Sequence, residues 1–135
     1  MIQQRANFDW MLKELHDGVP DIQMIVVLSA DGLRIARYGG EPDTADRVAA
    51  ACAGLQSLAS AVSQEIPTSD GDMKMVLIEM NGGYFYLMAA GPNAYLAVLS
   101  DVRCEPGRMG LSMADLVARI GPHLTSPARR NGQTV

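Results

Sequence analysis

VAAACAGLQSLASAVSQ, residues 48–64, runs through the middle of the chain without one charged side chain. Its residues are mostly good helix formers, so the stretch predicts a helix of roughly 25 Å. One side of that helix is an apolar stripe made of Val48, Cys52, Leu55, Ala59, Val62 and Ile66. The other side is small or neutral, where a surface helix usually presents Lys and Glu to water. We therefore expect burial on two sides, by the protein's own core and by a second subunit; the alternative is an Ala-rich helix left half exposed.

Composition restricts the classes of partner and compartment. The 135 residues suit one domain, and 11 basic against 15 acidic side chains give a net charge of −4, without the basic stripe that nucleic-acid binding needs. The N-terminus lacks a secretory apolar region, and no apolar stretch is long enough to enter a membrane. Cys52 and Cys104 are too few for a disulfide framework. A cytoplasmic protein is expected.

The segment before the neutral helix predicts one helix and a hairpin. Apolar residues at helical spacing from Phe8 to Leu15 indicate an amphipathic helix that ends at Gly18. The apolar run within 22–28 is typical of a central strand covered on both faces, and 33–38 is interpreted as its returning partner. Asp43 or Thr44 can cap the neutral helix.

Three strands and a helix follow the neutral helix. The strands are expected at 73–80, 84–90 and 94–100, with Asn81-Gly82 as the strongest hairpin signal in the chain. Apolar residues from Met109 to Leu124 recur at helical spacing, and Gly121-Pro122 should weaken or end that helix. Residues 126–135 show no apolar periodicity and are expected to form a mobile tail.

The order helix, two strands, helix, three strands, helix predicts an α+β domain. Short hairpin links within each strand group favour an antiparallel sheet with helices on its faces. No interior linker indicates a second domain.

Motifs for catalysis, metals and cofactors are missing from the sequence. His16 and His123 have no neighbouring ligand at metal spacing, and no phosphate loop or nucleophile elbow occurs. Asp70 and Asp72 flank Gly71, which is more typical of a turn than of a cation loop. We therefore expect a protein that is not an enzyme and that carries no cofactor.

Trp10 stands apart from the other aromatic residues. On the first helix it lies about opposite Phe8, Leu12 and Leu15, on the side of Lys13 and Asp17. An aromatic side chain on a polar helix face can anchor a partner. The competing interpretation is that Trp10 folds over the last helix as peripheral core.

Three local sequences, in this element order, resemble the Roadblock/dynein light chain family. They are Val19-Pro20-Asp21-Ile22, then 27–33 with its Ser-Ala-Asp-Gly turn, and the alanine-rich helix from Ala45 to Glu65. Within the family the chain is most similar to the bacterial branch that includes the gliding-motility GTPase-activating protein and the roadblock proteins of actinomycete conservon operons. The resemblance spans residues 5–125 as one Roadblock-like domain. Asp21 departs from the pattern, because many relatives have Gly after the Pro.

The resemblance implies a profilin-like, five-stranded antiparallel sheet with the first and last helices on one face. It also implies a homodimer in which the middle helix and the strand after it meet their mates. The residues expected at that interface are Ala49, Ala53, Gln56, Ser57, Ser60, Ser63, Met73, Met75 and Leu77.

Functionally, the resemblance implies a non-catalytic regulator or scaffold that binds a Ras-like small GTPase, with GTPase activation achieved without an inserted arginine finger. A sensor-kinase-like membrane protein would be a further partner. The alternative is a small-molecule-sensing module of the PAS-like type, which would need an apolar pocket with convergent polar groups.

Overall fold

The computed structural model describes the backbone of residues 2–133 and the side chains of residues 8–124. Its elements follow the expected order: α1 (Ile2–Gly18), β1 (Ile22–Ser29), β2 (Arg34–Tyr38), α2 (Pro42–Ser63), β3 (Met75–Met80), β4 (Gly83–Ala89), β5 (Ala94–Asp101) and α3 (Pro106–Gln133). The predicted α+β arrangement, a five-stranded antiparallel sheet with three helices in this order, is confirmed. Two expected strands are shorter than predicted, since β3 begins at Met75 and β2 at Arg34.

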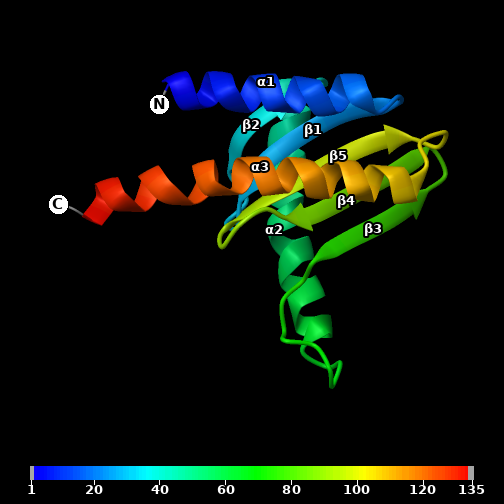
Figure 1. Cartoon of the computed structure of the whole chain (residues 1–135). Coiled ribbons are helices and arrows are strands. Elements are labelled where there is room, and N and C mark those ends of the chain that lie inside the picture. The colour runs from blue at the N-terminus through cyan, green and yellow to red at the C-terminus, as the bar shows by residue number, and fades with distance from the viewer. Residues whose placement is uncertain (1, 134–135) are drawn as a thin grey trace.

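The five strands form one antiparallel sheet in the order β2-β1-β5-β4-β3. Helices α1 and α3 cover one face, and α2 crosses the other (Figure 1). β1 lies inside the sheet with both faces covered, which is why its apolar run is continuous. Ile25 and Val27 point to the α1 and α3 face, while Met24, Val26 and Leu28 point to α2.

Helix α3 is longer than its sequence signals indicate. Met109, Met113, Leu116 and Ile120 are fully buried against the sheet, and the helix continues through Gly121-Pro122 to Gln133. The expected end at this pair is therefore wrong. A proline inside a helix removes one hydrogen bond at a cost of about 3 kcal/mol, and packing on the N-terminal side of Pro122 outweighs that local cost. The mobility expected for residues 126–135 stays a prediction, and their side chains lie outside the described part of the chain.

Helix α2 begins two or three residues earlier than the predicted caps, Asp43 or Thr44, would require. Glu41 is the N-cap residue, its side chain makes no capping hydrogen bond, and Pro42 opens the helix. Neither Asp43 nor Thr44 is the cap, which corrects the sequence prediction. Proline suits the first helical position because its φ angle is preset and it has no N–H to satisfy.

The N-terminal half of α2 lies close to the sheet because its contact residues are small. Ala45, Ala49 and Cys52, at helical spacing, are buried against Met24, Val26 and Leu28. The β1–β2 turn also approaches closely: a Cβ on Gly32 would lie 3.1 Å from the Cβ of Ala53. The C-terminal half of α2 then extends past the sheet, and the α2–β3 connection returns from its far end (Figure 1).

Candidate interaction surface

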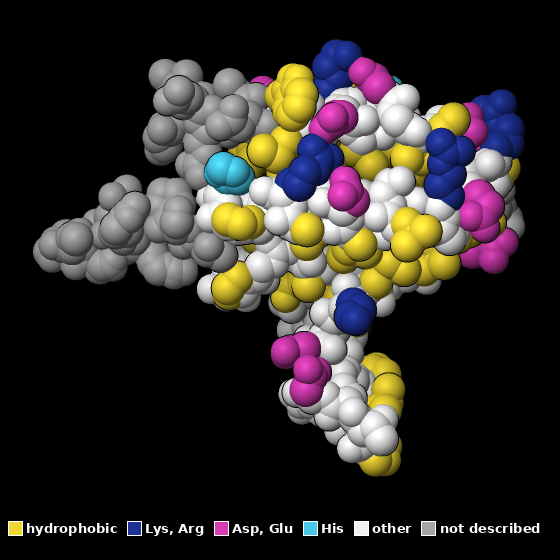
Figure 2. Space-filling model, viewed as in Figure 1, with side chains coloured by type: hydrophobic (Ala, Val, Ile, Leu, Met, Phe, Trp, Pro, Cys, Tyr) yellow, Lys and Arg dark blue, Asp and Glu magenta, His cyan; other side chains and the backbone are white. Residues whose placement is uncertain are grey.

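The far end of α2 and the turn after it, residues 57–66, form a projection that we call the α2 overhang. It exposes Leu58 by 68%, Val62 by 63% and Ile66 by 50%. Hydrophobic side chains are visible along one side of the projection in Figure 2. Large apolar side chains that are exposed together on a segment extending past the sheet are typical of a protein contact.

The burial of α2 corrects the orientation that we predicted for this helix. Val62 and Ile66 were expected in the core and are exposed, whereas Ala49 was expected at a subunit interface and is fully buried in its own protomer. Ala49 cannot contact a second subunit because β1 already covers it. The helical wheel assumed one buried face along the whole length, while the sheet ends before the helix does.

The other polar and small residues expected at the interface occupy different surroundings. Gln56 is half-buried and accepts a 2.9 Å hydrogen bond from the Tyr95 hydroxyl. The Ser63 hydroxyl bonds the Ser69 hydroxyl and donates to the Asp72 carbonyl at 3.3 Å, so it holds the connection to β3. Ser57 is exposed, while Ala53 and Ser60 are half-buried. Leu58 was not predicted at any contact, although its i, i+4 spacing to Val62 places two large apolar residues on one side of the helix.

Strand β3 is an edge of the sheet and is apolar on both faces. Met75 and Leu77 are exposed by 38% and 43%, and their register partners place them on the α1 and α3 face. Val76 and Ile78 are half-buried on the α2 face. Met73 precedes the strand and packs against the α2 side of the core. β3 therefore presents apolar side chains on both faces of the sheet edge.

The two edges of the sheet differ in how they are protected. β2 has five residues, carries Arg34 and Arg37, and adjoins a register irregularity at Val27/Leu28. Short length, charge and bulges are the devices by which proteins block unwanted strand pairing. β3 has six residues, no proline, and Glu79 as its one charge. The exposed edge that lacks these devices is β3.

Arginines near β2 are engaged within the protomer. Arg34 Nε lies 2.6 Å from Asp46 Oδ1, and this hydrogen bond lowers the pKa of Asp46. Arg37 donates to the carbonyls of Gly39 and Gly40 at 3.2 and 3.1 Å. Arg47 donates to the Thr44 hydroxyl at 3.2 Å. β2, which carries the first two, lies at the opposite edge of the sheet from β3.

Residues 8–124 also show whether side chains could form a metal site or a reactive thiol. Within that range no three His, Cys, Asp or Glu side chains gather as a metal site. Burial raises the pKa of the Cys52 thiol to about 11, which disfavours the reactive thiolate. His16 meets the Tyr38 ring edge-on at 5.0 Å between centroids, and His123 meets Phe8 at 6.4 Å.

Over the described part of the chain, no helix is long and apolar enough to cross a membrane.

Trp10 lies on α1, away from the α2 overhang, and is 62% exposed. It borders a hollow formed with Lys13, Glu14, Asp17 and Gly18. The interpretation of Trp10 as peripheral core is therefore wrong, because a core side chain would be covered. Its role as a partner anchor stays a prediction.

The sheet, the three helices and the bare apolar edge define an α+β domain whose most distinctive surface suits protein contacts. Residues 8–100 match the Roadblock/LC7 domain. The chain belongs to the Roadblock/LC7 family. No curated protein matches it.

Solved structures agree with this assignment. A Roadblock/LC7 domain from Streptomyces avermitilis is 34% identical, with a TM-score of 0.81 over 87% of this chain and 98% of that one. MglB of Myxococcus xanthus is 16% identical, with a TM-score of 0.75 over 93% and 97%. The gliding protein MglB of Thermus thermophilus is also 16% identical, with a TM-score of 0.75 over 90% of each chain. The two MglB structures show a shared fold.

Proposed function

We propose that two copies of the chain pair along β3 and that the α2 overhang of each copy packs on the other. One observation carries this proposal: the least protected sheet edge, β3, and the exposed apolar overhang of α2 are consecutive along the chain and are joined by a single connection. Pairing β3 with its mate would satisfy the outward backbone groups and cover Met75 and Leu77. The dimer interface then includes Leu58, Val62 and Ile66 in place of Ala49.

Amide hydrogen exchange tests the pairing directly. Within 75–78, the amides that point away from β4 should exchange slowly, because a partner strand would bond them. The matched control is β2, whose outward amides should exchange fast at the other edge of the same sheet. Fast exchange at both edges, with β1 and β5 protected, would contradict the pairing.

We further propose that the dimer binds a Ras-like small GTPase as a regulator or scaffold. Membership in the Roadblock/LC7 family supports this assignment. The dimer itself should hydrolyse no nucleotide. If it accelerates hydrolysis by its partner, the expected route is repositioning of the partner's own catalytic groups.

The arginines of this chain support that route. An arginine finger must reach the transferring phosphoryl group and stabilise its charge, and Arg34 and Arg37 are held in intramolecular contacts. Arg47 is the least restrained of the three and is therefore the sharpest test.

The experiment uses Ras-like small GTPases recovered with a tagged copy of this chain from its native cell lysate. Complex formation is measured by size-exclusion chromatography with light scattering, and GTP hydrolysis is followed with and without the dimer. Arg34→Ala, Arg37→Ala and Arg47→Ala should each retain most of any acceleration, like the control Arg103→Ala on an exposed arginine elsewhere. A loss of about a thousandfold from one of the three would identify a finger. Absence of a complex with the wild-type dimer would remove the GTPase proposal.

The alternative, a small-molecule sensor, would place its ligand in an apolar pocket such as the space between α2 and the sheet. Ala45, Ala49 and Cys52 pack directly on β1 there and fill that space. The structure therefore favours the protein-binding function. A sensor-kinase-like membrane partner and a cytoplasmic location stay predictions.

A further inference from the structure

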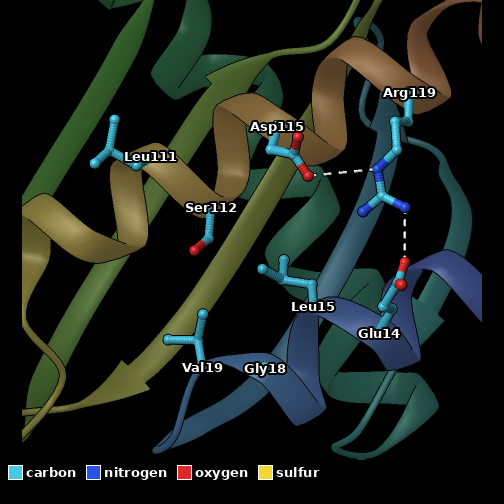
Figure 3. A pocket seen from close by; sticks show the side chains of 8 residues that line it. All are labelled: Glu14, Leu15, Gly18, Val19, Leu111, Ser112, Asp115 and Arg119. Atoms are coloured by element: carbon cyan, nitrogen blue, oxygen red, sulfur yellow. Dashed lines mark hydrogen bonds and ion pairs between the residues drawn. The ribbon is translucent and has the colours of Figure 1, made fainter.

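A hollow lies between the last turns of α1 and the first half of α3, on the sheet face opposite α2 (Figure 3). Leu15 and Val19 are buried at its base on the α1 side. Leu111 stands on the α3 side and is 76% exposed, the largest exposed fraction among the described large hydrophobic residues. The hollow thus has one apolar side, made of Leu15, Val19 and the unburied Leu111, and is otherwise lined mainly by polar and charged residues.

An ion-paired cluster closes one end of this hollow. Arg119 Nη1 lies 2.6 Å from Glu14 Oε1, and Arg119 Nε lies 3.5 Å from Asp115 Oδ2 (Figure 3). Glu14 takes the short contact, so Asp115 is held less closely, and its side chain is 73% exposed. One arginine therefore faces two carboxylates, and the cluster has an excess negative charge.

The end of α1 already holds a cation from this chain. The Gly18 carbonyl accepts a 3.2 Å hydrogen bond from Arg108, and the last carbonyls of a helix carry partial negative charge. Asp17 is paired with Lys13 at 2.7 Å. A cation entering the hollow would meet Asp115 without first breaking the short Glu14 contact.

A second hollow adjoins the first across α1. It shares Glu14 and Gly18 with it and is bordered by the exposed Trp10. On the face formed by α1 and α3, hydrophobic and charged side chains interleave (Figure 2). Two exposed apolar side chains, Leu111 and Trp10, therefore border hollows that share Glu14 and Gly18.

We propose that this α1–α3 groove docks an amphipathic helix of another protein, with a large apolar side chain next to a lysine or arginine. The apolar side chain fills the recess between Leu15, Val19 and Leu111. The cation pairs with Asp115, which has the weaker of the two contacts to Arg119. A helix suits the site because a third helix can lie in the groove between two packed ones. The site is on the opposite sheet face from α2 and does not depend on the proposed dimer or GTPase.

Two synthetic helical peptides of about 18 residues, long enough to form a helix in water, are the probes. They share one leucine stripe at i, i+3, i+4 and i+7 and differ in carrying lysine or glutamate beside it. Each is titrated into the isotopically labelled full chain. The lysine peptide should shift the backbone amide signals of Gly18, Leu111, Ser112 and Asp115, and should bind at least about tenfold more tightly than the glutamate peptide, a difference of about 1.4 kcal/mol.

Variants of the protein locate the binding. Leu111→Ser and Asp115→Lys should each weaken the lysine peptide by about tenfold or more. Leu33→Ser, at a residue 65% exposed after the β1–β2 turn, is the matched control and should bind like the wild type. Thermal unfolding should be unchanged in all three, because these side chains are exposed. Equal binding of both peptides, no binding of either, or undiminished binding by Leu111→Ser would overturn the proposal.

Discussion

The Tyr95 hydroxyl donates a 2.9 Å hydrogen bond to Oε1 of Gln56, which joins the start of β5 to the middle of α2. The amide nitrogen of Gln56 in turn donates to the Ala53 carbonyl at 3.3 Å. Both ends of the Gln56 amide are therefore satisfied within one protomer. This contact lies where α2 leaves the sheet and helps to set the direction of the overhang.

Replacing Tyr95 with Phe should lower the free energy of unfolding by about 1 kcal/mol, because the ring stays and one half-buried hydrogen bond is lost. Urea denaturation of the isolated chain measures the change. In a Gln56→Leu background the same replacement should cost much less, since the partner is already absent. Equal costs in both backgrounds would show that the hydroxyl contributes through some other contact.

Replacing Leu58 or Val62 with Arg should weaken the dimer, because an unpaired charge would be forced into the proposed contact. Both side chains are exposed in the protomer, so the fold should be kept. Sedimentation measures the dimer fraction. Leu111→Arg, at an exposed residue of α3 on the opposite face of the sheet, is the control and should leave it unchanged. A wild-type protein that is monomeric at tens of micromolar would contradict the dimer itself.

Asp21 is the single described non-glycine residue with a positive φ angle, 73°. This left-handed conformation suits Gly, which explains why a Gly at this position is the expected pattern. Asp21→Ala should be about 1 kcal/mol less stable than Asp21→Gly. Both variants lose the 3.3 Å contact to Arg103. The difference in their free energies of unfolding therefore measures the cost of holding a non-glycine residue at a positive φ angle. Equal thermal stability of the two would contradict the strain.

Asp101 should make stability depend on pH in the acid range. Its carboxylate accepts a 3.0 Å hydrogen bond from the Arg103 side chain and another at 2.9 Å from the Arg103 backbone, and these lower its pKa below the ordinary 3.8. The unfolded chain then binds more protons than the folded one near that pH. The contribution is present above about pH 3.8 and is lost as the pH falls through the folded-state pKa. In a denaturation series, Asp101→Asn should reduce the fall in stability below about pH 3.8 relative to the wild type. An equal fall in the variant would contradict this contribution.

Much of the fold could be predicted because the strand signals are local. The continuous apolar run of β1 requires cover on both faces, and Asn81-Gly82 joins neighbouring strands. The element order follows from such signals alone. The candidate surface could be predicted less well, because no local pattern separates the exposed Leu58 from the buried Ala49 on a helix without charges. The second-subunit contact of this helix stays a prediction.

The sequence by itself determined the type and order of the elements, because periodicity and turn chemistry act over a few residues. Tertiary structure decided which side of α2 is buried, since nearly every side of that helix is small or apolar and only the position of the sheet distinguishes them. It also decided that α3 passes Pro122, because the turns before this proline pack on strands that are distant in the sequence. The pairing of Glu14 with Arg119, 105 positions apart, follows from two helices meeting on one sheet face, and no local pattern encodes that meeting.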